Sequence, residues 1–221
     1  MSVQTYDWYF DVNSPFAYLQ WKTRDRLAGI ATLRPIPVVL GALLTHWEQK
    51  GPAEIPPKRF HTYRACQWRA EKLGIQFRFP PAHPFNPIAA LRLIVALDAS
   101  EEAVDVVFTA AYGEGRDISD PAVLDELGRA LGLADVATAI SQSSVKLRLR
   151  ENTDAAIARG VFGVPTTIVN EELFWGEDTT EMLAEYLTDP ALFDTPEMRR
   201  LRTLPEGVQR APAKPPVKPP A

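Results

Sequence analysis

The sequence predicts an α/β fold in which a β-α-β unit and a β-β-α unit are separated by a long all-helical block. Residues 5–39 show strand-like alternation, then a helical period, then a second β-rich run. From residue 42 to residue 159 the apolar positions recur with helical spacing. After Gly160 the run "VPTTIV", the turn-like "NEE" and the apolar "LFW" predict a hairpin, followed by a last helix. Because a two-stranded hairpin is marginally stable alone, the two units are expected to form one sheet around the insert.

The first unit is predicted from residues 5–13, a strand with alternating apolar positions, and a helix from Pro15 to about Leu27. Proline is tolerated in the first turn because its missing N–H has no helical partner there. Residues 32–39 predict the second strand, and its two prolines at 35 and 37 indicate an edge strand. This spacing predicts parallel strands joined by a right-handed crossover.

The chain is therefore expected to divide into four parts. Residues 1–41 and 160–190 form one discontinuous α/β domain, with its last helix at about 178–187, and residues 42–159 form an inserted helical domain. Residues 191–204 predict a C-terminal helix. Residues 205–221 are proline-rich and almost free of large apolar side chains, so they predict a disordered tail. Its "PVKP" is the loosest form of a proline-rich docking peptide, which leaves docking as the alternative to a passive tail.

Composition excludes several classes of function. The 221 residues include 46% hydrophobic residues and carry a formal charge of −4, so no basic surplus favours nucleic acid or anionic lipid. The start of the chain lacks a signal-peptide pattern, and no run of 18 apolar residues occurs, so a cytoplasmic protein is expected. One cysteine, Cys66, permits neither an internal disulfide nor a Cys-x-x-Cys pair, and three histidines without ligand spacing predict no metal site.

The stretch Asn13-Ser14-Pro15 lies where the first strand gives way to the first helix. A helix N-terminus presents free backbone N–H groups and the positive end of the helix dipole. A hydroxyl at Ser14 could therefore hold or activate an anion, or it could be an ordinary N-cap.

Two short motifs carry a resemblance to the thioredoxin fold. Ser14-Pro15-Phe16-Ala17 occupies the strand-to-helix junction where thiol oxidoreductases of that fold carry Cys-Pro-x-Cys, and Val164-Pro165 precedes a strand where the fold keeps a cis-proline. Together, the stretches "WYFDVNSPFAYLQW", "FRFPPAHPFNPIAALRL" and "GVFGVPTTIVNEELFWGED" resemble the 2-hydroxychromene-2-carboxylate isomerases, relatives of kappa-class glutathione transferases, over about residues 5–188. The resemblance implies a glutathione-dependent enzyme that is normally a homodimer.

The resemblance also implies roles for individual residues. Ser14 would stabilise the glutathione thiolate, with Phe16 beside it, and the backbone of Val164, followed by a cis Pro165, would pair with the cysteinyl backbone. An acidic residue at the start of the last helix, Asp178 or its neighbour Glu177, would accept the γ-glutamyl ammonium, although Asp178 could equally cap that helix. Lys58 is the candidate for a glutathione carboxylate.

The isomerisation that the resemblance implies adds the thiolate to a conjugated double bond of an aromatic substrate, allows rotation, and then expels the sulfur. Negative charge develops on the substrate, which calls for a cation or hydrogen-bond donor, and Arg64, Arg69 and His83 are candidates. Asn86 could hydrogen-bond the substrate, or Asn86-Pro87 could simply start the next helix.

The sequence departs from the relatives' pattern at two places. Ala65 and Trp68 stand where an aspartate and an arginine are usual, and Thr179 follows Asp178 where an arginine is usual. Two alternatives to the isomerase therefore stay open: a kappa-like glutathione transferase acting on electrophiles, and a non-catalytic binding module. A disulfide oxidoreductase is excluded, because Cys66 lies in the helical block and no cysteine occupies position 14 or 17. Cys66 is expected to be a small buried hydrophobe.

Overall fold

The computed structural model describes residues 3–208, which form one mixed four-stranded sheet with helices on both faces. The strands follow the order β2-β1-β3-β4 across the sheet; β1 is parallel to β2, whereas β3 is antiparallel to both β1 and β4. They are β1 (Gln4–Phe10), β2 (Ala31–Pro37), β3 (Thr166–Val169) and β4 (Glu172–Trp175). The predicted thioredoxin-like arrangement around a helical insert is confirmed, and the strand containing Pro35 and Pro37 lies at a sheet edge.

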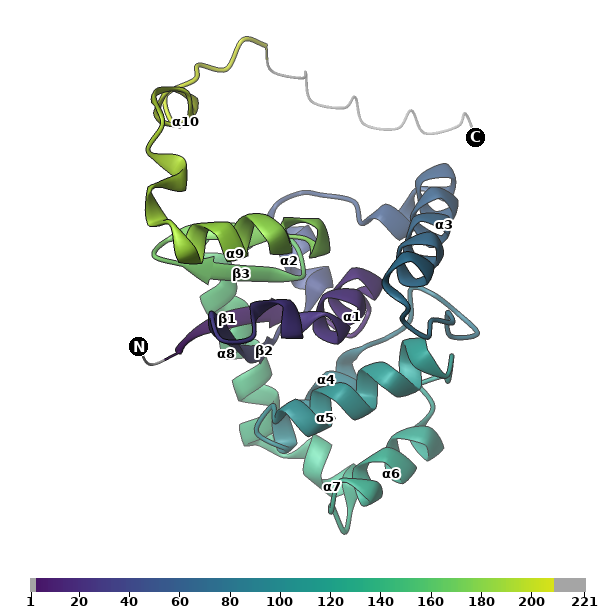
Figure 1. Cartoon of the computed structure of the whole chain (residues 1–221). Coiled ribbons are helices and arrows are strands. Elements are labelled where there is room, and N and C mark those ends of the chain that lie inside the picture. The colour runs from purple at the N-terminus through teal and green to yellow at the C-terminus, as the bar shows by residue number, and fades with distance from the viewer. Residues whose placement is uncertain (1–2, 209–221) are drawn as a thin grey trace, which may run out of the picture.

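Ten α-helices are present between residues 3 and 208. They are α1 (Pro15–Lys22), α2 (Leu40–His46), α3 (Pro56–Leu73), α4 (Ile88–Ala96), α5 (Glu101–Phe108), α6 (Pro121–Ala130), α7 (Val136–Ser141), α8 (Ser143–Ala158), α9 (Thr180–Thr188) and α10 (Pro196–Leu201). None of these helices is long and apolar enough to cross a membrane. Figure 1 shows α3 to α7, which belong to the insert, extending from the sheet, with α3 at the margin of the molecule.

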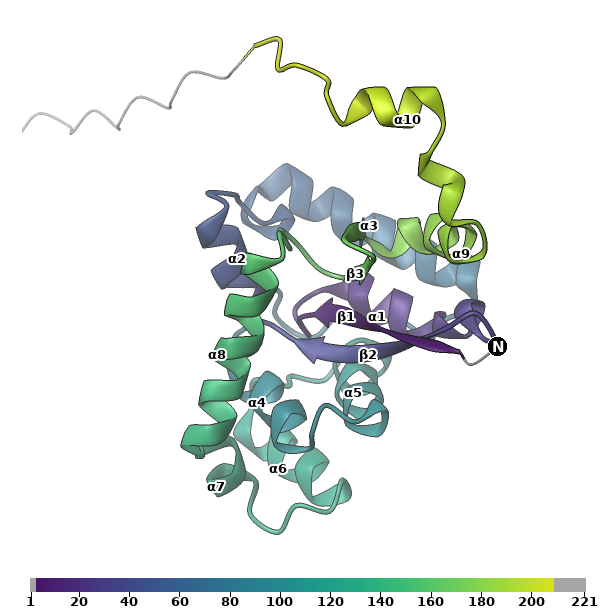
Figure 2. The ribbon, with the colours of Figure 1, turned by 90° about the vertical axis from the view of Figure 1, so that its left-hand side faces the viewer.

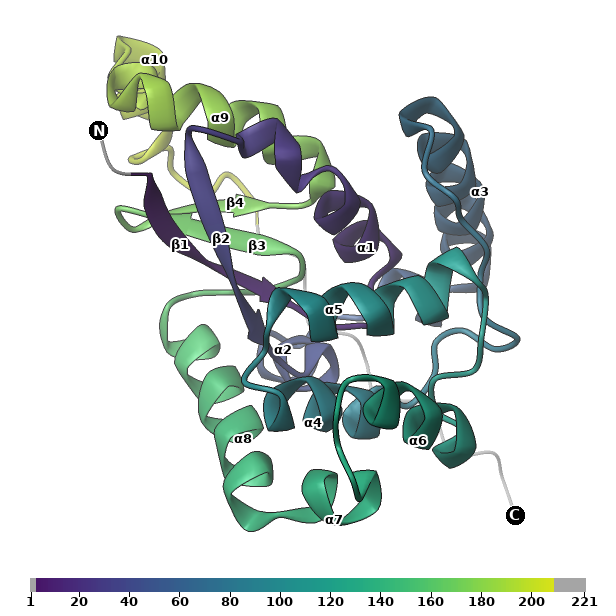
Figure 3. The same cartoon turned by 60° about the horizontal axis from the view of Figure 1, so that its bottom comes forward.

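Each face of the sheet has its own apolar layer. Trp8 and Phe10 of β1 pack with α1, α9 and the insert helices in the larger core, whereas Tyr9 faces the other side, with α2 and α8. Figure 3 shows the sheet between α1 and α9 on one side and α8 on the other. This alternation is the period of two that the sequence predicts for the first strand.

The first strand and the first helix are both shorter than the sequence predicts. The strand ends at Phe10 because the chain turns at Asp11: the Ser14 amide donates to the Asp11 carbonyl at 3.0 Å. The helix ends at Lys22 and continues as a 3₁₀ helix over Arg24–Leu27. The early turn brings residue 14 to the helix N-terminus as its N-cap.

The C-terminal segment lies apart from the sheet, beyond α9 (Figure 2). Residues 191–204, for which the sequence predicts one helix, contain most of a 3₁₀ helix at Pro190–Phe193 and then α10. Each of these starts at a proline, which suits the first helical turn but cannot continue a helix from the preceding residues. The predicted tail lies mostly outside the described residues.

Candidate active site

Ser14 sits at the N-terminus of α1, in the extended conformation typical of an N-cap (φ −100°, ψ 110°). Its Oγ accepts a hydrogen bond from the Ala17 amide at 3.2 Å and donates to the Val164 carbonyl at 3.4 Å. The residue is 6% exposed. The serine is thus both an N-cap and a contact to a segment 150 residues away in the chain.

The segment facing Ser14 is the loop that leads into β3. The Val164–Pro165 peptide bond is cis, as the resemblance implies. Within the described residues, the Val164 amide has no hydrogen-bond acceptor, and neither does the Phe16 amide in the first turn of α1. Both the helix start that carries Ser14 and the loop that its hydroxyl contacts therefore have a backbone donor without a partner.

The carbonyl oxygens of this loop, residues 161–165, are all engaged. Each accepts one hydrogen bond, and Val164 accepts that of Ser14. The other four pairs are Trp47 Nε1 to Val161 (3.0 Å), Gln49 Nε2 to Phe162 (3.3 Å), Thr166 Oγ1 to Gly163 (2.8 Å) and the Gly176 amide to Pro165 (2.8 Å). The loop is held through its acceptors, which leaves the donor of Val164 available.

Asp11 supports the same junction from inside. Its carboxyl group is fully buried and accepts from the amides of Asn13 and Leu40, each at 2.8 Å. Burial raises the pKa of the Asp11 carboxyl to about 6, and the two backbone hydrogen bonds oppose that rise. Asp11 therefore ties the turn before Ser14 to the start of α2.

A second network holds Asn13 from the side of the insert. The Asn13 side-chain amide pairs with the backbone of Phe85 in both directions, at 3.2 and 3.3 Å. His83 Nε2 lies 2.9 Å from the Asn13 carbonyl, which can only accept, so Nε2 carries the proton. The Tyr63 hydroxyl lies 2.9 Å from Nδ1 and 2.6 Å from the His83 carbonyl, and these two acceptors share its single hydrogen. Burial lowers the pKa of His83, which favours the neutral ring.

These contacts show how the structure uses the two residues predicted to bind substrate. Both ring nitrogens of His83 face protein groups, so the ring supports the backbone beside Ser14. Asn86 is exposed, and its Oδ1 accepts from the Ile88 amide at 3.1 Å, which is the helix-start geometry of the alternative interpretation.

The two acidic residues before α9 differ sharply. The Glu177 side chain is 3% exposed and takes two hydrogen bonds from Arg69 of α3, at 2.9 and 3.0 Å, with Arg26 at 3.8 Å. Asp178 is exposed, caps no helix, and makes no hydrogen bond or ion pair within residues 3–208. Of these two carboxylates, that of Asp178 is the one exposed to solvent.

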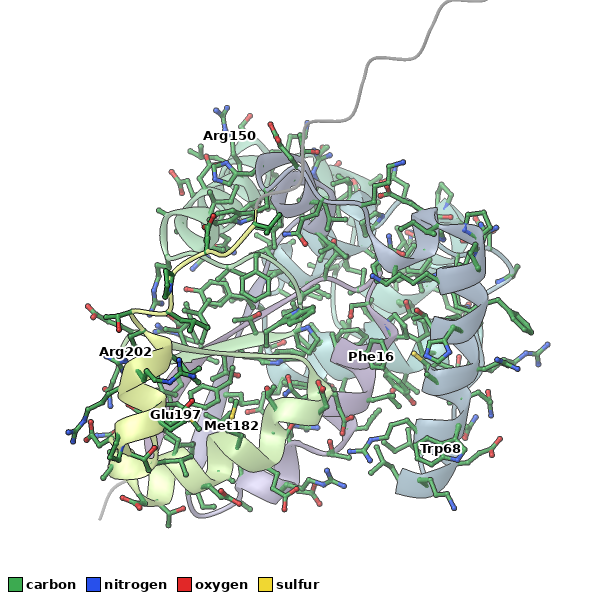
Figure 4. All side chains as sticks on the ribbon, turned by 90° about the horizontal axis from the view of Figure 1, so that it is seen from above. Phe16, Trp68, Arg150, Met182, Glu197 and Arg202 are labelled. Atoms are coloured by element: carbon green, nitrogen blue, oxygen red, sulfur yellow. The ribbon has the colours of Figure 1, made fainter. Side chains whose placement is uncertain are left out.

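Three other candidates lie on or against α3. Lys58 is exposed in the first turn of α3 and has no ion pair in the described part of the chain. Phe16 is half-buried, and Figure 4 shows it on α1 on the side toward α3. Arg64 is exposed and lies over the Phe60 ring, 4.7 Å from its centroid.

Cys66 has no place in this chemistry. Its thiol is fully buried, and burial raises its pKa to about 12. No group of three potential metal ligands occurs among residues 3–208.

Sequence reasoning missed several residues that shape the site: Asp11, Asn13, Trp47, Gln49 and Tyr63. Their partners lie up to 114 residues away along the chain, so no local sequence pattern predicts these contacts. The one local signal was the polar break after the first strand, which includes Asp11 and Asn13.

Comparison with known proteins shows the family and the fold of this chain. Residues 5–188 match the model of the DSBA-like thioredoxin domain. The 2-hydroxychromene-2-carboxylate isomerase of Pseudomonas putida is 32% identical over 188 residues, covering 80% of this chain and 91% of that protein. Glutathione S-transferase kappa 2 of Caenorhabditis elegans is 28% identical over 204 residues, covering 82% and 91%.

Among solved structures, a 2-hydroxychromene-2-carboxylate isomerase superposes with a TM-score of 0.73 at 27% identity, covering 86% of this chain and 97% of that one. The resemblance inferred from the sequence motifs is confirmed by these matches. The chain therefore belongs to the family of DSBA-like thioredoxin domains, and it has a serine and an alanine at the two positions of the redox pair.

Proposed function

We propose that this protein is a glutathione-dependent cis-trans isomerase acting on aromatic compounds of the 2-hydroxychromene-2-carboxylate type. One observation carries the proposal: the Ser14 hydroxyl lies at the N-terminus of α1, 3.4 Å from the carbonyl of Val164, whose amide has no acceptor in the described chain. A thiol peptide that pairs with the Val164 backbone brings its sulfur to that hydroxyl.

The site suits a thiolate. Glutathione reacts as its thiolate, and a hydroxyl donor together with the positive end of a helix dipole favours the charged form. In this chain the sulfur arrives with the cofactor, because residues 14 and 17 are serine and alanine and Cys66 is buried in the insert.

The other groups of the tripeptide are assigned to four residues of this chain. We assign the cysteinyl backbone to Val164 beside Pro165, the γ-glutamyl ammonium to Asp178 and a carboxylate to Lys58, with Phe16 against the peptide. Glu177 acts indirectly, since its carboxylate is already paired with Arg69. Glutathione, a thiol peptide with one free amine and two free carboxylates, supplies the groups that these assignments require.

In the isomerase reaction the sulfur of the thiolate forms a bond to the conjugated carbon, and the electron pair of the double bond moves onto the substrate as an enolate. Rotation about the resulting single bond and expulsion of the sulfur restore the double bond and the thiolate. Of the cations on α3, Arg64 is the candidate for this charge, because Arg69 is paired with Glu177. Asn86 offers its amide N–H groups, and His83 contributes by holding Asn13. Relatives named as isomerases, at 28–32% identity, support this reaction class.

A kappa-like transferase is the second candidate, and the relative named glutathione S-transferase kappa 2 favours it. Both reactions use the same thiolate, but a transferase leaves the sulfur bound to its product. We place the protein in the cytoplasm, where glutathione is kept reduced, and propose a homodimer, which light scattering after size exclusion tests directly.

The test is calorimetric titration of glutathione into the wild type and Ser14→Ala, with thiolate absorbance followed against pH. Ser100→Ala is the matched control, because Ser100 caps α5 with the same hydroxyl-to-amide geometry, at 3.3 Å, away from the site. The expected result is that wild type and Ser100→Ala bind glutathione and lower its thiol pKa, while Ser14→Ala binds without lowering it. If neither wild type nor control binds glutathione, a non-catalytic binding module is favoured. Product analysis then separates isomerase from transferase.

A further inference from the structure

Two hydrogen-bond donors compete for the Val164 carbonyl. In the free protein it accepts the hydrogen of Ser14 Oγ at 3.4 Å, and under the proposed function it is also the acceptor for the cysteinyl N–H of the bound peptide. We infer that the peptide N–H replaces the Ser14 hydroxyl on the Val164 carbonyl, and that this replacement releases the hydroxyl hydrogen to the thiolate. Glutathione would thereby switch on the donor that activates it. This inference rests on the proposed function.

The geometry makes the Ser14 contact the replaceable one among those that hold the loop. The carbonyls of the other four residues between 161 and 165 receive their donors at 2.8 to 3.3 Å, whereas the Ser14 contact is the longest at 3.4 Å. A hydroxyl hydrogen also turns about its C–O bond without moving a heavy atom. The contact can therefore break without disturbing the loop.

The oxygen of Ser14 stays in place while its hydrogen turns. The Ala17 amide donates to Oγ at 3.2 Å, which fixes the oxygen at the first turn of α1 and leaves the hydroxyl its single hydrogen. That hydrogen points either to the Val164 carbonyl or to a sulfur beside it. A charged sulfur is the stronger acceptor, and the thiol proton that it has lost passes to solvent water.

The exchange also explains why the switch needs the peptide N–H. Val164 is 8% exposed, so turning the hydroxyl away would leave its carbonyl without a donor, which opposes the change. Once the peptide N–H occupies the carbonyl, no buried acceptor is left unpaired. A thiol without an amide N–H in that position is held by the site but meets a hydroxyl still turned toward Val164.

The carbonyl carbon of Val164 reports the exchange directly. Protein labelled with ¹³C at valine carbonyls is compared by NMR as wild type and Ser14→Ala, each free and saturated with glutathione, with Val164→Ile to assign the signal and Ser100→Ala as control. We expect Ser14→Ala to move the Val164 signal in the free protein and to leave it unmoved in the complex, where the peptide N–H has replaced the hydroxyl.

An equal difference between wild type and Ser14→Ala in both states would show that the hydroxyl stays on Val164, and would overturn the inference while leaving glutathione binding intact. Absence of any difference in the free protein would also overturn it. If calorimetry shows no binding of glutathione at all, the proposed function is wrong, and the inference that rests on it is wrong as well.

A glutathione analogue methylated on the cysteinyl nitrogen gives an independent readout. It keeps the thiol, the amine and both carboxylates but lacks the N–H. We expect its thiol pKa, measured by thiolate absorbance on the wild type under saturation, to equal that of glutathione on Ser14→Ala, roughly a unit above that of glutathione on the wild type. At a pH below both pKa values, this difference is an about tenfold loss of thiolate. An analogue thiol ionised as fully as glutathione on the wild type contradicts the exchange.

Discussion

Arg69 of α3 holds the carboxylate of Glu177, just before α9, through two parallel hydrogen bonds of 2.9 and 3.0 Å. The two residues are 108 positions apart in the sequence, and their side chains are 34% and 3% exposed. This pair fastens the inserted helix α3 to the end of the sheet domain that carries Asp178. It therefore keeps the two sides of the proposed glutathione site together.

Breaking this pair is expected to destabilise the protein strongly. Arg69→Met leaves the Glu177 carboxylate buried with only Arg26 at 3.8 Å, and removal of one partner of a buried pair costs about 3 kcal/mol. Urea unfolding measures the loss. Arg69→Met combined with Glu177→Met should recover most of it, because no charge is then left buried.

The control for this prediction is Arg129→Ala, which breaks an exposed pair with Asp125 on α6 and should change stability little. Equal losses for Arg69→Met and Arg129→Ala would contradict the assignment of Glu177 as a buried, dependent charge.

Asp11 predicts a particular pH dependence of stability. Burial raises its pKa to about 6 in the folded protein, whereas the unfolded chain has the ordinary value of 3.8. Between these two values the folded state binds more protons than the unfolded state, so stability falls as the pH rises. A difference of two pKa units amounts to about 3 kcal/mol, lost between roughly pH 4 and pH 6 and constant above that.

Urea unfolding of the wild type and Asp11→Asn at several pH values measures this effect, because the variant does not titrate at residue 11. Between roughly pH 4 and pH 6, the unfolding free energy of the wild type should fall relative to that of Asp11→Asn. Above that window the difference should stay constant. Parallel curves for the two proteins would show that Asp11 ionises in the folded state as it does in the unfolded chain.

Much of the fold could be predicted from the sequence, because the decisive signals are local. Alternation in β1, Pro15 at a helix start and the β-branched run before Val169 each act within a few residues. Ser14 could be found for the same reason, since an N-cap is recognised from its immediate neighbours. The end of the first strand was misplaced because Val12 continues the apolar alternation while the backbone already turns at Asp11.

The rest of the site depends on contacts that no local pattern encodes. Asn13 meets Phe85 across 72 residues, and Arg69 meets Glu177 across 108. The residue types fit several roles equally well in the sequence: an arginine on a helix can bind substrate, or it can hold a buried glutamate. Only the packing of α3 against the sheet domain distinguishes these roles.

Cys66 is expected to be chemically silent in the folded protein. Its thiol is fully buried, and burial raises its pKa to about 12, so almost no thiolate is present at neutral pH. Titration with a chromogenic disulfide should therefore detect no reactive thiol in the native protein and one per chain in urea. Rapid labelling of native protein, abolished in Cys66→Ala, would show that the interior beside α3 opens readily.

Gly163 lies in the loop that presents Val164, and its lack of a side chain is required by Trp175. A Cβ at residue 163 would stand 2.6 Å from Trp175 Nε1, so Gly163→Ala must displace either the indole or the loop. Overpacking of this kind costs about 1–3 kcal/mol, and here it also disturbs the backbone that we propose pairs with glutathione. Gly163→Ala is therefore expected to lower both the unfolding free energy and the affinity for glutathione.

Trp175 is 51% exposed, so Trp175→Ala alone should be mild, and the double variant should recover what Gly163→Ala loses. Gly41→Ala is the matched control, because a Cβ there meets nothing within 4 Å and lies in α2, where alanine is favoured over glycine by about 1 kcal/mol. Urea unfolding and calorimetric titration of the four variants measure both quantities. Failure of Trp175→Ala to rescue Gly163→Ala would mean that the loop, and not the indole contact, sets the requirement for glycine.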